Sequence, residues 1–283
     1  MVKYPFHSLD DFLKSSTLDV DGQLDDGWGA PFCVKGRLFN GAVLFADISG
    51  FSKHTKDFSP TETLVFVNNF FSWMSAEGLR FTHGIVDKYI GDEMMVVFAR
   101  EFGSEDPIVD AVNSARWMIE RDVLDYRPRI GIAYGEMIAG YVGTPLAYNA
   151  SVFGKPVTLA ARCCSTARMM EGGGSIVMTA STWGNRTVES VMKPRLIKHP
   201  DKGEVSLPVE WTTGARRMED LKNIGETEVL ELCYGYREDG SVLMRFSPYT
   251  LEQRTKDSIK ALEKQGCFHQ IRFPHEVDAN GPA

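Results

Sequence analysis

The stretch GIVDKYIGDEMMVVF at residues 84–98 decides the fold that this sequence predicts. Ile85 to Tyr89 and Met94 to Phe98 are two short, strand-forming runs. Between them, Gly91-Asp92 is a pair of residues that is common in tight turns. The stretch therefore predicts a β-hairpin that carries the carboxylate of Asp92 in its turn.

A buried strand and a helix are expected ahead of this hairpin. The apolar run GAVLFA at residues 41–46 is suited to a buried strand, and Asp47 ends it. Ser59 as N-cap, Pro60 at the first helical position and Glu62 at the third predict a helix that begins with a capping box. The apolar residues that recur at helical spacing after this start are Leu64, Val67, Phe71 and Met74.

Further strands and helices are expected to alternate along the rest of the chain. Helices are expected over residues 107–121, from 156 onward and over 247–266, and strands over 129–134, 175–179, 207–213 and 228–232. Gly135, Gly140 and Gly143 are expected to break up the segment that follows residue 134. Strands interleaved with helices, together with one hairpin, predict a domain with a mixed sheet, of either the α/β or the α+β class.

The composition excludes several classes of protein. Of the 283 residues, 43% are hydrophobic and 24% are charged, which is typical of a folded globular protein and not of a disordered one. The formal net charge of -7 argues against general binding to nucleic acid. No apolar run approaches the ~20 residues of a membrane helix, and the N-terminus lacks a secretory apolar region. Five cysteines without a C-x-x-C spacing predict a reducing, cytoplasmic location.

Two carboxylates suggest the chemistry. An aspartate at a strand end or in a hairpin turn is by itself most simply a residue that caps the turn. A strand that ends in Asp47, then a helix, then a hairpin with Asp92 in its turn would place both carboxylates at the same end of one sheet. Two carboxylates that share divalent ions beside a phosphate-binding turn suit phosphoryl-transfer chemistry.

Four segments together resemble the class III nucleotide cyclases, the adenylate and guanylate cyclase family. The segments are FADISGF at 45–51, the hairpin at 84–98, RIGIAYGE with GYVG at 129–143, and VFGKPVTLAAR at 152–162. They occur in the family's order and spacing. The resemblance implies an α+β sandwich with a ferredoxin-like βαββαβ core and a mixed, mainly antiparallel sheet. It implies a catalytic domain at residues 38–236, between an N-terminal arm at 1–37 and a C-terminal helix and tail at 237–283.

The resemblance also implies a two-metal site that binds a nucleoside triphosphate. Asp47, Ile48 and Asp92 match the metal residues, which would hold two Mg²⁺ or Mn²⁺ ions. The backbone from Ile48 to Phe51 matches the turn that contacts the β- and γ-phosphates. One ion would activate the ribose 3′-hydroxyl, and both would neutralise charge at the α-phosphate during in-line attack.

Basic residues complete the match. Arg162 corresponds to the arginine that stabilises charge on the pentacoordinate phosphorus, and Arg129 and Lys222 correspond to residues that hold the triphosphate. Family sites form between two catalytic domains, whereas this chain has one domain that retains both sets of residues. The resemblance therefore implies a head-to-tail homodimer with two equivalent sites.

The residues that would contact the base depart from the family. Lys88 matches the lysine of adenylate cyclases, where guanylate cyclases have Glu. Ser151 stands in place of an Asp or Thr, and Thr158 in place of the Asn that orients the ribose. These departures resemble the pyrimidine cyclases of bacterial antiphage defence, the Pycsar type, which make cyclic UMP or cyclic CMP. We expect UTP to be used at least as well as ATP, followed by CTP, with GTP poorest.

Three other interpretations remain open. The chain could be an adenylate cyclase that tolerates these substitutions. It could be a catalytically dead regulatory module, because Thr158 removes one family residue, although Asp47, Asp92, Lys88 and Arg162 are all kept. A diguanylate-cyclase-like enzyme is disfavoured, since the hairpin has no Gly-Gly-Asp/Glu-Glu-Phe signature. The helix expected near the C-terminus carries mixed charges, which favours packing on the domain or its partner over membrane binding.

Overall fold

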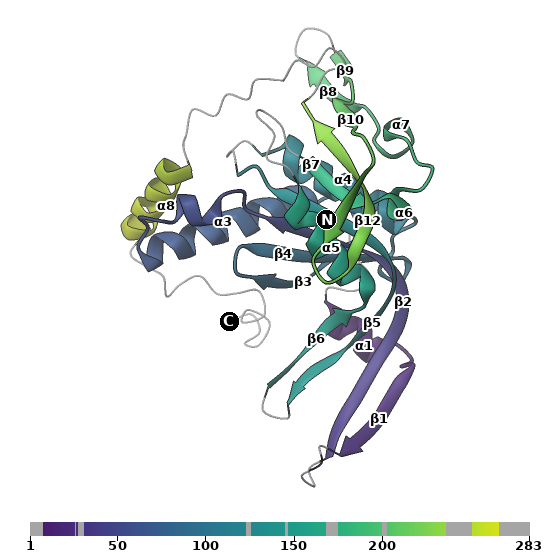
Figure 1. Ribbon diagram of the computed structural model, residues 1–283. Helices are drawn as coiled ribbons and strands as arrows, with labels where there is room; N and C mark the ends of the chain where they lie inside the picture. The colour runs from purple at the N-terminus through teal and green to yellow at the C-terminus, as the bar shows by residue number, and fades with distance from the viewer. Residues whose placement is uncertain are drawn as a thin grey trace.

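The computed structural model describes residues 8–25, 27, 31–122, 126–144, 147–167, 175–199, 203–235 and 251–265. The main sheet in these residues has ten strands (Figure 1). They are β1 (Val20–Asp25), β2 (Pro31–Asp47), β3 (Gly84–Ile90), β4 (Glu93–Ala99), β5 (Arg129–Thr144), β6 (Ala147–Phe153), β7 (Ser175–Thr179), β10 (Trp211–Thr213), β11 (Arg217–Leu221) and β12 (Gly225–Tyr234). A separate hairpin pairs β8 (Arg195–His199) with β9 (Gly203–Leu207).

Helices cover both faces of the sheet (Figure 1). They are α1 (Leu9–Ser15), α2 (Phe51–His54), α3 (Pro60–Gly78), α4 (Pro107–Glu120), α5 (Lys155–Thr166), α6 (Ala180–Trp183), α7 (Val188–Val191) and α8 (Leu251–Gln265), with a 3₁₀ turn, η1, at Arg100–Phe102. α3 and α4 pack on one face, while α1 and α5 pack on the other.

The order of the strands confirms the expected α+β class. The elements β2-α3-β3-β4-α4-β5 follow one another as βαββαβ, and their strands lie side by side in the order β5-β2-β4-β3. These four strands pair antiparallel, and β7 then joins β5 in parallel. The sheet is therefore mixed and mainly antiparallel around a ferredoxin-like core.

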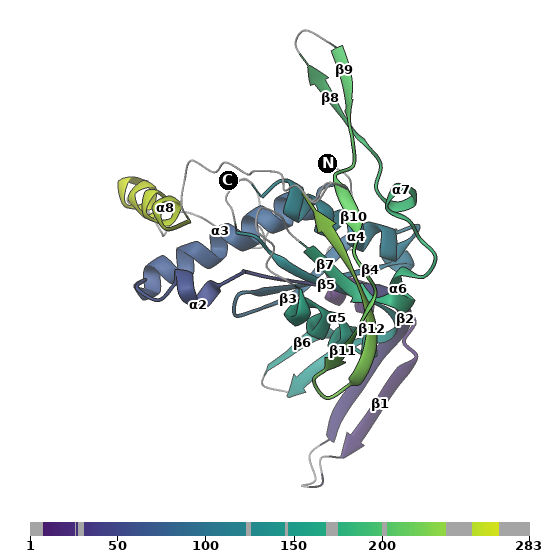
Figure 2. The same cartoon turned by 45° about the horizontal axis from the view of Figure 1, so that its top comes forward.

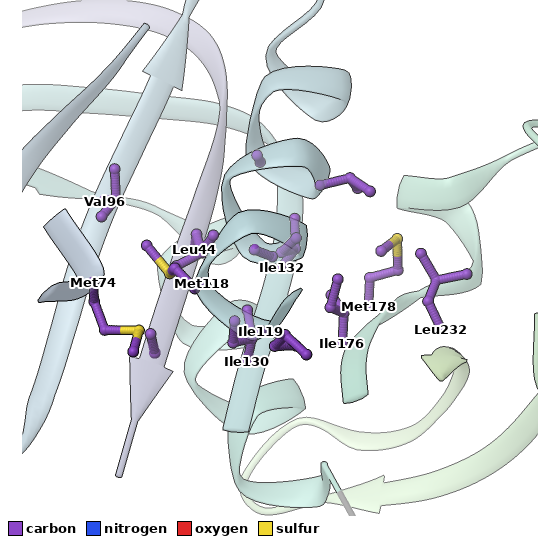
Figure 3. Close-up of a cluster of buried hydrophobic side chains, with 14 of the residues drawn as sticks. Leu44, Met74, Val96, Met118, Ile119, Ile130, Ile132, Ile176, Met178 and Leu232 are labelled. Atoms are coloured by element: carbon purple, nitrogen blue, oxygen red, sulfur yellow. The ribbon is translucent and has the colours of Figure 1, made fainter. Parts of the chain in front are cut away.

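The apolar run of β2 is explained by burial on both of its faces. Ala42, Leu44 and Ala46 face the core cluster under α3 and α4, to which Met118 also belongs (Figure 3). The alternate residues Val43 and Phe45 belong to the cluster under α1 and α5. Because successive side chains of a strand point to opposite faces, a strand covered on both sides is apolar at every position.

α3 begins as expected but presents a different face to the core. The Ser59 hydroxyl accepts from the backbone of Glu62, whose carboxylate accepts from the Ser59 backbone at 2.7 Å. Leu64, however, is 62% exposed, and Phe66 and Phe70 are fully buried instead. The expected stripe was wrong at Leu64, because an aromatic cluster on the neighbouring positions decides which way the helix faces.

The glycines after residue 134 do not break the chain. β5 runs unbroken from Arg129 to Thr144, so the expected break was wrong. Gly135 lies opposite Gly41 in the β2–β5 ladder, and Gly140 lies opposite Gly36. A Cβ on Gly140 would come within 2.8 Å of a backbone carbonyl oxygen of β2. Gly140 thus permits a close approach of β5 to β2, and Gly135 leaves room for Pro156 of α5, both within continuous strand pairing.

Two other expectations change at the edges of the domain. The strand expected over 207–213 is divided, since β9 ends at Leu207 and β10 begins at Trp211 (Figure 2). The C-terminal helix is present as α8, which packs against α3 through a hydrogen bond of 3.1 Å between Asn69 and Ser258. Residues 247–250 and 266 lie outside the described part of the chain. Within that part, no helix is long and apolar enough to cross a membrane.

Candidate active site

The two predicted metal carboxylates meet at one end of the sheet. Asp47 is the last residue of β2, and Asp92 lies in the turn between β3 and β4. The pairing of β2 with β4 places Asp47 opposite Glu93, the residue after Asp92. Asp92 is close enough to Asp47 to raise the pKa of its carboxyl. The order strand, helix, hairpin therefore brings the two acids together, as the sequence suggests.

The electrostatics of this pair suit a divalent cation. Burial and the neighbouring Asp92 together raise the pKa of Asp47 to about 7, against the opposing effect of Arg129. Burial and the charge of Asp92 also raise the pKa of Glu93. Neighbouring buried carboxylates repel each other when both are ionised. A hard divalent cation, which prefers oxygen ligands, would neutralise that repulsion. The donor set fits Mg²⁺ or Mn²⁺.

The carbonyl of Ile48 is available beside the pair. Ile48 is fully buried, and its carbonyl oxygen accepts a hydrogen bond of 3.3 Å from the Phe51 amide. A carbonyl has a second lone pair, so this bond leaves room for a metal contact. Among the described residues, no group of three or more His, Cys, Asp and Glu side chains is placed to hold a metal. A metal here would need backbone oxygen, water or substrate as further ligands.

The turn after Asp47 is held in a fixed shape. Gly50 has a φ of 71°, a left-handed conformation that glycine adopts without strain, and it precedes α2. The Ser49 hydroxyl donates to the carbonyl of Arg127, on the segment just before β5. Phe51 stacks on Phe66 of α3 with ring centroids 6.3 Å apart. Two neighbouring elements thus anchor the predicted phosphate turn.

Arg129 is positioned by the sheet itself. It is the first residue of β5 and lies directly opposite Asp47 in the β2–β5 ladder. Its guanidinium forms an ion pair with the Asp47 carboxylate. One of the two predicted triphosphate ligands is therefore in the metal-carboxylate cluster, which we define as Asp47, Asp92 and Arg129.

Lys88 and Ser151 form a second cluster. Lys88 is on β3 and Ser151 on β6, and the Lys88 ammonium donates to the Ser151 hydroxyl. The Lys88 nitrogen also lies 5.9 Å from the centre of the Phe153 ring. The two positions expected to contact the base are therefore neighbours in space, although 63 residues separate them.

Asp87 belongs to this second cluster, and sequence reasoning missed it. Its carboxylate lies 3.2 Å from the Lys88 nitrogen and 3.2 Å from the Ser151 hydroxyl oxygen. An acid next to Lys88 in sequence was visible in the motif, but alternation along a strand would have pointed it to the opposite face. We call Asp87, Lys88 and Ser151 the base-edge cluster.

α5 carries Thr158 and Arg162 one helical turn apart, so they share a face. Thr158 is exposed and Arg162 half-buried. The Nε atom of Arg162 is buried and has no hydrogen-bond partner within the described chain. α5 crosses β5 at backbone contact, because a Cβ on Gly131 would overlap the Ala160 carbonyl oxygen and the Cys164 amide nitrogen. This close approach fixes the position of the α5 backbone that carries Arg162.

Lys222 is not brought to the other site residues. It is exposed in the turn between β11 and β12, before Asn223, which has a φ of 65°. Among the described residues, no hydrogen bond or ion pair joins Lys222 to either cluster. The two clusters are also not joined to each other by any such contact in the part of the chain that the structure describes. Within the described residues, the predicted site residues therefore form two separate clusters.

Comparison with known proteins identifies the fold and the family. A family model for the adenylate and guanylate cyclase catalytic domain matches residues 35–207. The crystal structure of the adenylyl cyclase CyaB from P. aeruginosa is 20% identical, with a TM-score of 0.55 over 72% of this chain and 98% of that one. The guanylyl cyclase Cya2 is also 20% identical, with a TM-score of 0.54 over 74% and 99%. At this identity the likeness shows the fold alone.

Curated relatives are less informative about function. An uncharacterized protein of Mycobacterium tuberculosis (strain H37Rv) is 32% identical over 134 residues, which cover 46% of this chain and 25% of that protein. A second one is 31% identical over 130 residues. The chain thus matches about a quarter of the length of these relatives. The family model covers more than half of the chain, and the chain belongs to the adenylate and guanylate cyclase catalytic-domain family, the class III nucleotide cyclases.

Proposed function

We propose that this chain converts a nucleoside triphosphate into a 3′,5′-cyclic nucleoside monophosphate and pyrophosphate. The observation that carries the proposal is the position of Asp47 at the end of β2, opposite Glu93 and beside the turn that holds Asp92. Two Mg²⁺ or Mn²⁺ ions bound there would neutralise phosphate charge and activate the ribose 3′-hydroxyl. The 3′-hydroxyl loses its proton to solvent, its oxygen attacks the α-phosphorus, the bond from the α-phosphorus to the bridging oxygen breaks, and pyrophosphate leaves.

The chain's own residues bind and orient the substrate. Arg129 already lies at the metal carboxylates, from where its guanidinium can reach the triphosphate. Phe51 anchors the turn whose backbone faces the terminal phosphates. Arg162, always charged, stabilises negative charge that grows on the α-phosphate in the transition state. Thr158 contacts the ribose, and Lys222 reaches the triphosphate from its exposed turn.

The active form is a head-to-tail homodimer with two equivalent sites. The two clusters on one chain make no mutual hydrogen bond or ion pair among the described residues, although a cyclase needs both at one substrate. Pairing the metal-carboxylate cluster of one protomer with the base-edge cluster and α5 of its partner completes a site. Twofold symmetry then produces a second, identical site.

The base is a pyrimidine, with UTP preferred over CTP. The ammonium of Lys88 donates, which suits a uracil carbonyl, and Ser151 is shorter than the family's Asp. An adenylate cyclase is the second candidate, and one observation favours it. Because the Ser151 hydroxyl donates its proton to Asp87, its oxygen is left to accept, as the N6 amine of adenine requires.

The cyclic nucleotide serves as a second messenger in antiphage defence, made in the cytoplasm. Support for the defence role is the departure of Ser151 and Thr158 from the residues of purine cyclases. Support for the location is the cysteine pattern, because five cysteines without a C-x-x-C spacing are typical of a protein from a reducing compartment. Cys267 lies outside the described residues. A rise of the cyclic nucleotide in phage-infected cells that express the chain, absent with Asp47→Asn, tests the defence role.

The reaction is tested with purified protein, Mn²⁺ and each of the four ribonucleoside triphosphates in turn. Pyrophosphate release and mass-spectrometric identification of the product report turnover. Asp47→Asn and Asp92→Asn should each abolish turnover, while the exposed Asp57→Asn, a matched control on the loop before α3, should keep it. Activity near that of the unmodified chain in either metal variant would show that the metal assignment is wrong. Absence of turnover with all four substrates would favour the regulatory-module interpretation.

A further inference from the structure

A β-bulge directs the Asp87 side chain into the base-edge cluster. The pairing of β3 with β4 shifts register between Val86 and Lys88, so Asp87 is the extra residue on its strand. A bulge re-aims side chains that strict alternation would send to opposite faces. As a result, Asp87 and Lys88, although adjacent in sequence, both contact the hydroxyl of Ser151.

The cluster buries a charge at a cost. The Asp87 side chain is 0% exposed, whereas that of Lys88 is 37% exposed. The Oδ1 atom of Asp87 has no hydrogen-bond partner among the described residues. Burial raises the pKa of Asp87, against the opposing effects of Lys88, Ser151 and the backbone of Val152. A buried carboxylate with one oxygen unpaired is unfavourable for stability, and such groups are concentrated at functional sites.

The contacts fix which hydrogen bonds the cluster can still make. Ser151 has one hydroxyl proton, which it donates to Asp87 at 3.2 Å, and it accepts a bond from Lys88. Its oxygen can then only accept from a ligand. The ammonium of Lys88 has three protons, of which Ser151 and Asp87 take two, so it can only donate. The cluster thus offers one acceptor beside one donor.

We propose that Asp87 is a positioning residue that sets base specificity by holding Ser151 as an acceptor and Lys88 as a donor. This inference rests on the proposed function. Uracil and guanine present an exocyclic carbonyl acceptor beside a ring N–H donor, whereas cytosine and adenine present a ring acceptor beside an exocyclic amine donor. A fixed order of Ser151 and Lys88 therefore separates the keto bases from the amino bases. A cavity of about 450 Å³ is lined by all three cluster residues, of which Lys88 has the exposed side chain.

The sharpest readout is the ratio of kcat/KM for UTP to that for CTP, because the two bases have the same ring size. Asp87→Ala frees the Ser151 hydroxyl to rotate and donate, so the ratio should move toward one by about ten-fold or more, mainly through KM. Asp87→Asn keeps an oxygen acceptor and should retain part of the preference. In the double variant Asp87→Ala/Ser151→Ala, the ratio should equal that of Ser151→Ala alone.

The matched control is Asp10→Ala. Asp10 also pairs with a lysine, Lys14, and borders the same cavity, but it touches neither Lys88 nor Ser151. This variant should keep the UTP-to-CTP ratio of the unmodified chain. A merely structural Asp87 would lower kcat/KM equally for both substrates and leave the ratio unchanged, which would overturn the inference. If Asp87→Ala does not fold, Asp87→Asn replaces it. The inference is overturned if Asp87→Asn leaves the UTP-to-CTP ratio unchanged and if the effects of Asp87→Asn and Ser151→Ala on kcat/KM are additive.

Failure of the proposed function is distinguishable from failure of this inference. If the unmodified chain releases no pyrophosphate from any substrate, the proposed function fails. The inference is then tested by calorimetric binding of the α,β-methylene analogues of UTP and CTP with Mn²⁺. A ratio of the two dissociation constants that is the same in the unmodified chain and in Asp87→Ala overturns the inference.

Discussion

Asp47 and Arg129 face each other across the β2–β5 ladder, and their side chains form an ion pair. The guanidinium holds the pKa of Asp47 below the value that burial and Asp92 alone would give. Without a metal, the guanidinium of Arg129 therefore compensates the negative charge of Asp47, which lies close to Asp92. A divalent cation bound at Asp47 would release Arg129 to bind substrate phosphate.

The first prediction concerns the pH dependence of the metal-free protein. The pKa of Asp47 rises from 3.8 to about 7 on folding, so between these values the folded state holds a proton that the unfolded state has lost. The free energy of unfolding should therefore fall as pH rises from about 4 to about 7, by roughly 2–4 kcal/mol. Chemical denaturation across this pH range measures it.

Mn²⁺ should reverse this loss, because it favours the ionised carboxylates. We expect Mn²⁺ to raise the Tm at pH 8 and to raise it much less at pH 5, where protons compete for the site. Asp47→Asn should be more stable than the unmodified chain at pH 8 without metal, and its response to Mn²⁺ should be small. An equal Mn²⁺ response in Asp47→Asn and the unmodified chain at both pH values would contradict the assignment.

The second prediction tests the shared site. Asp47→Ala and Arg162→Ala should each be inactive as homodimers. Co-expressed with different affinity tags and purified as a heterodimer, the two variants should recover one working site, or about half of the normal activity per dimer. Recovery is expected because one of the two sites then receives Asp47 from one chain and Arg162 from the other. An inactive, verified heterodimer would show that each site is built within one chain.

The third prediction concerns the crossing of α5 over β5. Gly131→Ala places a methyl group against the backbone of α5, so the helix must move away. We expect a loss of stability of about 1–3 kcal/mol and a larger fall in kcat than in metal affinity, since α5 carries Arg162. Gly22→Ala on β1 is the matched control, because nothing lies within 4 Å of its new Cβ. Equal kcat values in the two variants would show that the packing of α5 on β5 does not position Arg162 for catalysis.

Local sequence signals predicted the central elements well. The capping box fixed the start of α3, and the Gly91-Asp92 pair fixed the turn of the hairpin. β2 was expected only over residues 41–46, but it begins at Pro31 because β1 pairs with its first residues. Such pairing depends on a partner strand elsewhere in the chain. The residue pattern of one segment alone therefore does not predict how far its strand extends.

The candidate site was predictable where it depends on strand order. Asp47 ends a strand and Asp92 lies in a hairpin turn. Antiparallel pairing of that strand with the hairpin, as β2 pairs with β4, is enough to bring the two residues together. Asp87 was not predictable, because its contact with Ser151 depends on a bulge that moves it out of alternation. The close approach at Gly131 was equally hidden, since a glycine in a strand pattern suggests a break as readily as tight packing.

The last prediction tests the choice of base through Ser151→Asp. The new carboxylate would supply a longer acceptor for the N6 amine of adenine, so the ATP-to-UTP ratio of kcat/KM should rise. A hydrogen bond formed in a desolvated pocket is worth ~1–3 kcal/mol, or roughly 5- to 150-fold in that ratio. The same carboxylate would lie beside Asp87, whose oxygen is 3.2 Å from the Ser151 hydroxyl, so repulsion should reduce the gain.

Ser151→Asn separates these effects, because its amide oxygen accepts without adding charge next to Asp87. If repulsion limits Ser151→Asp, Ser151→Asn should show the larger shift toward ATP, and Asp87→Asn combined with Ser151→Asp should restore the shift. A competition assay with all four nucleoside triphosphates at equal concentration measures the ratios in one reaction. Clear dominance of ATP in the unmodified chain would contradict the pyrimidine proposal, and the acceptor oxygen of Ser151 would then be the adenine contact of an adenylate cyclase.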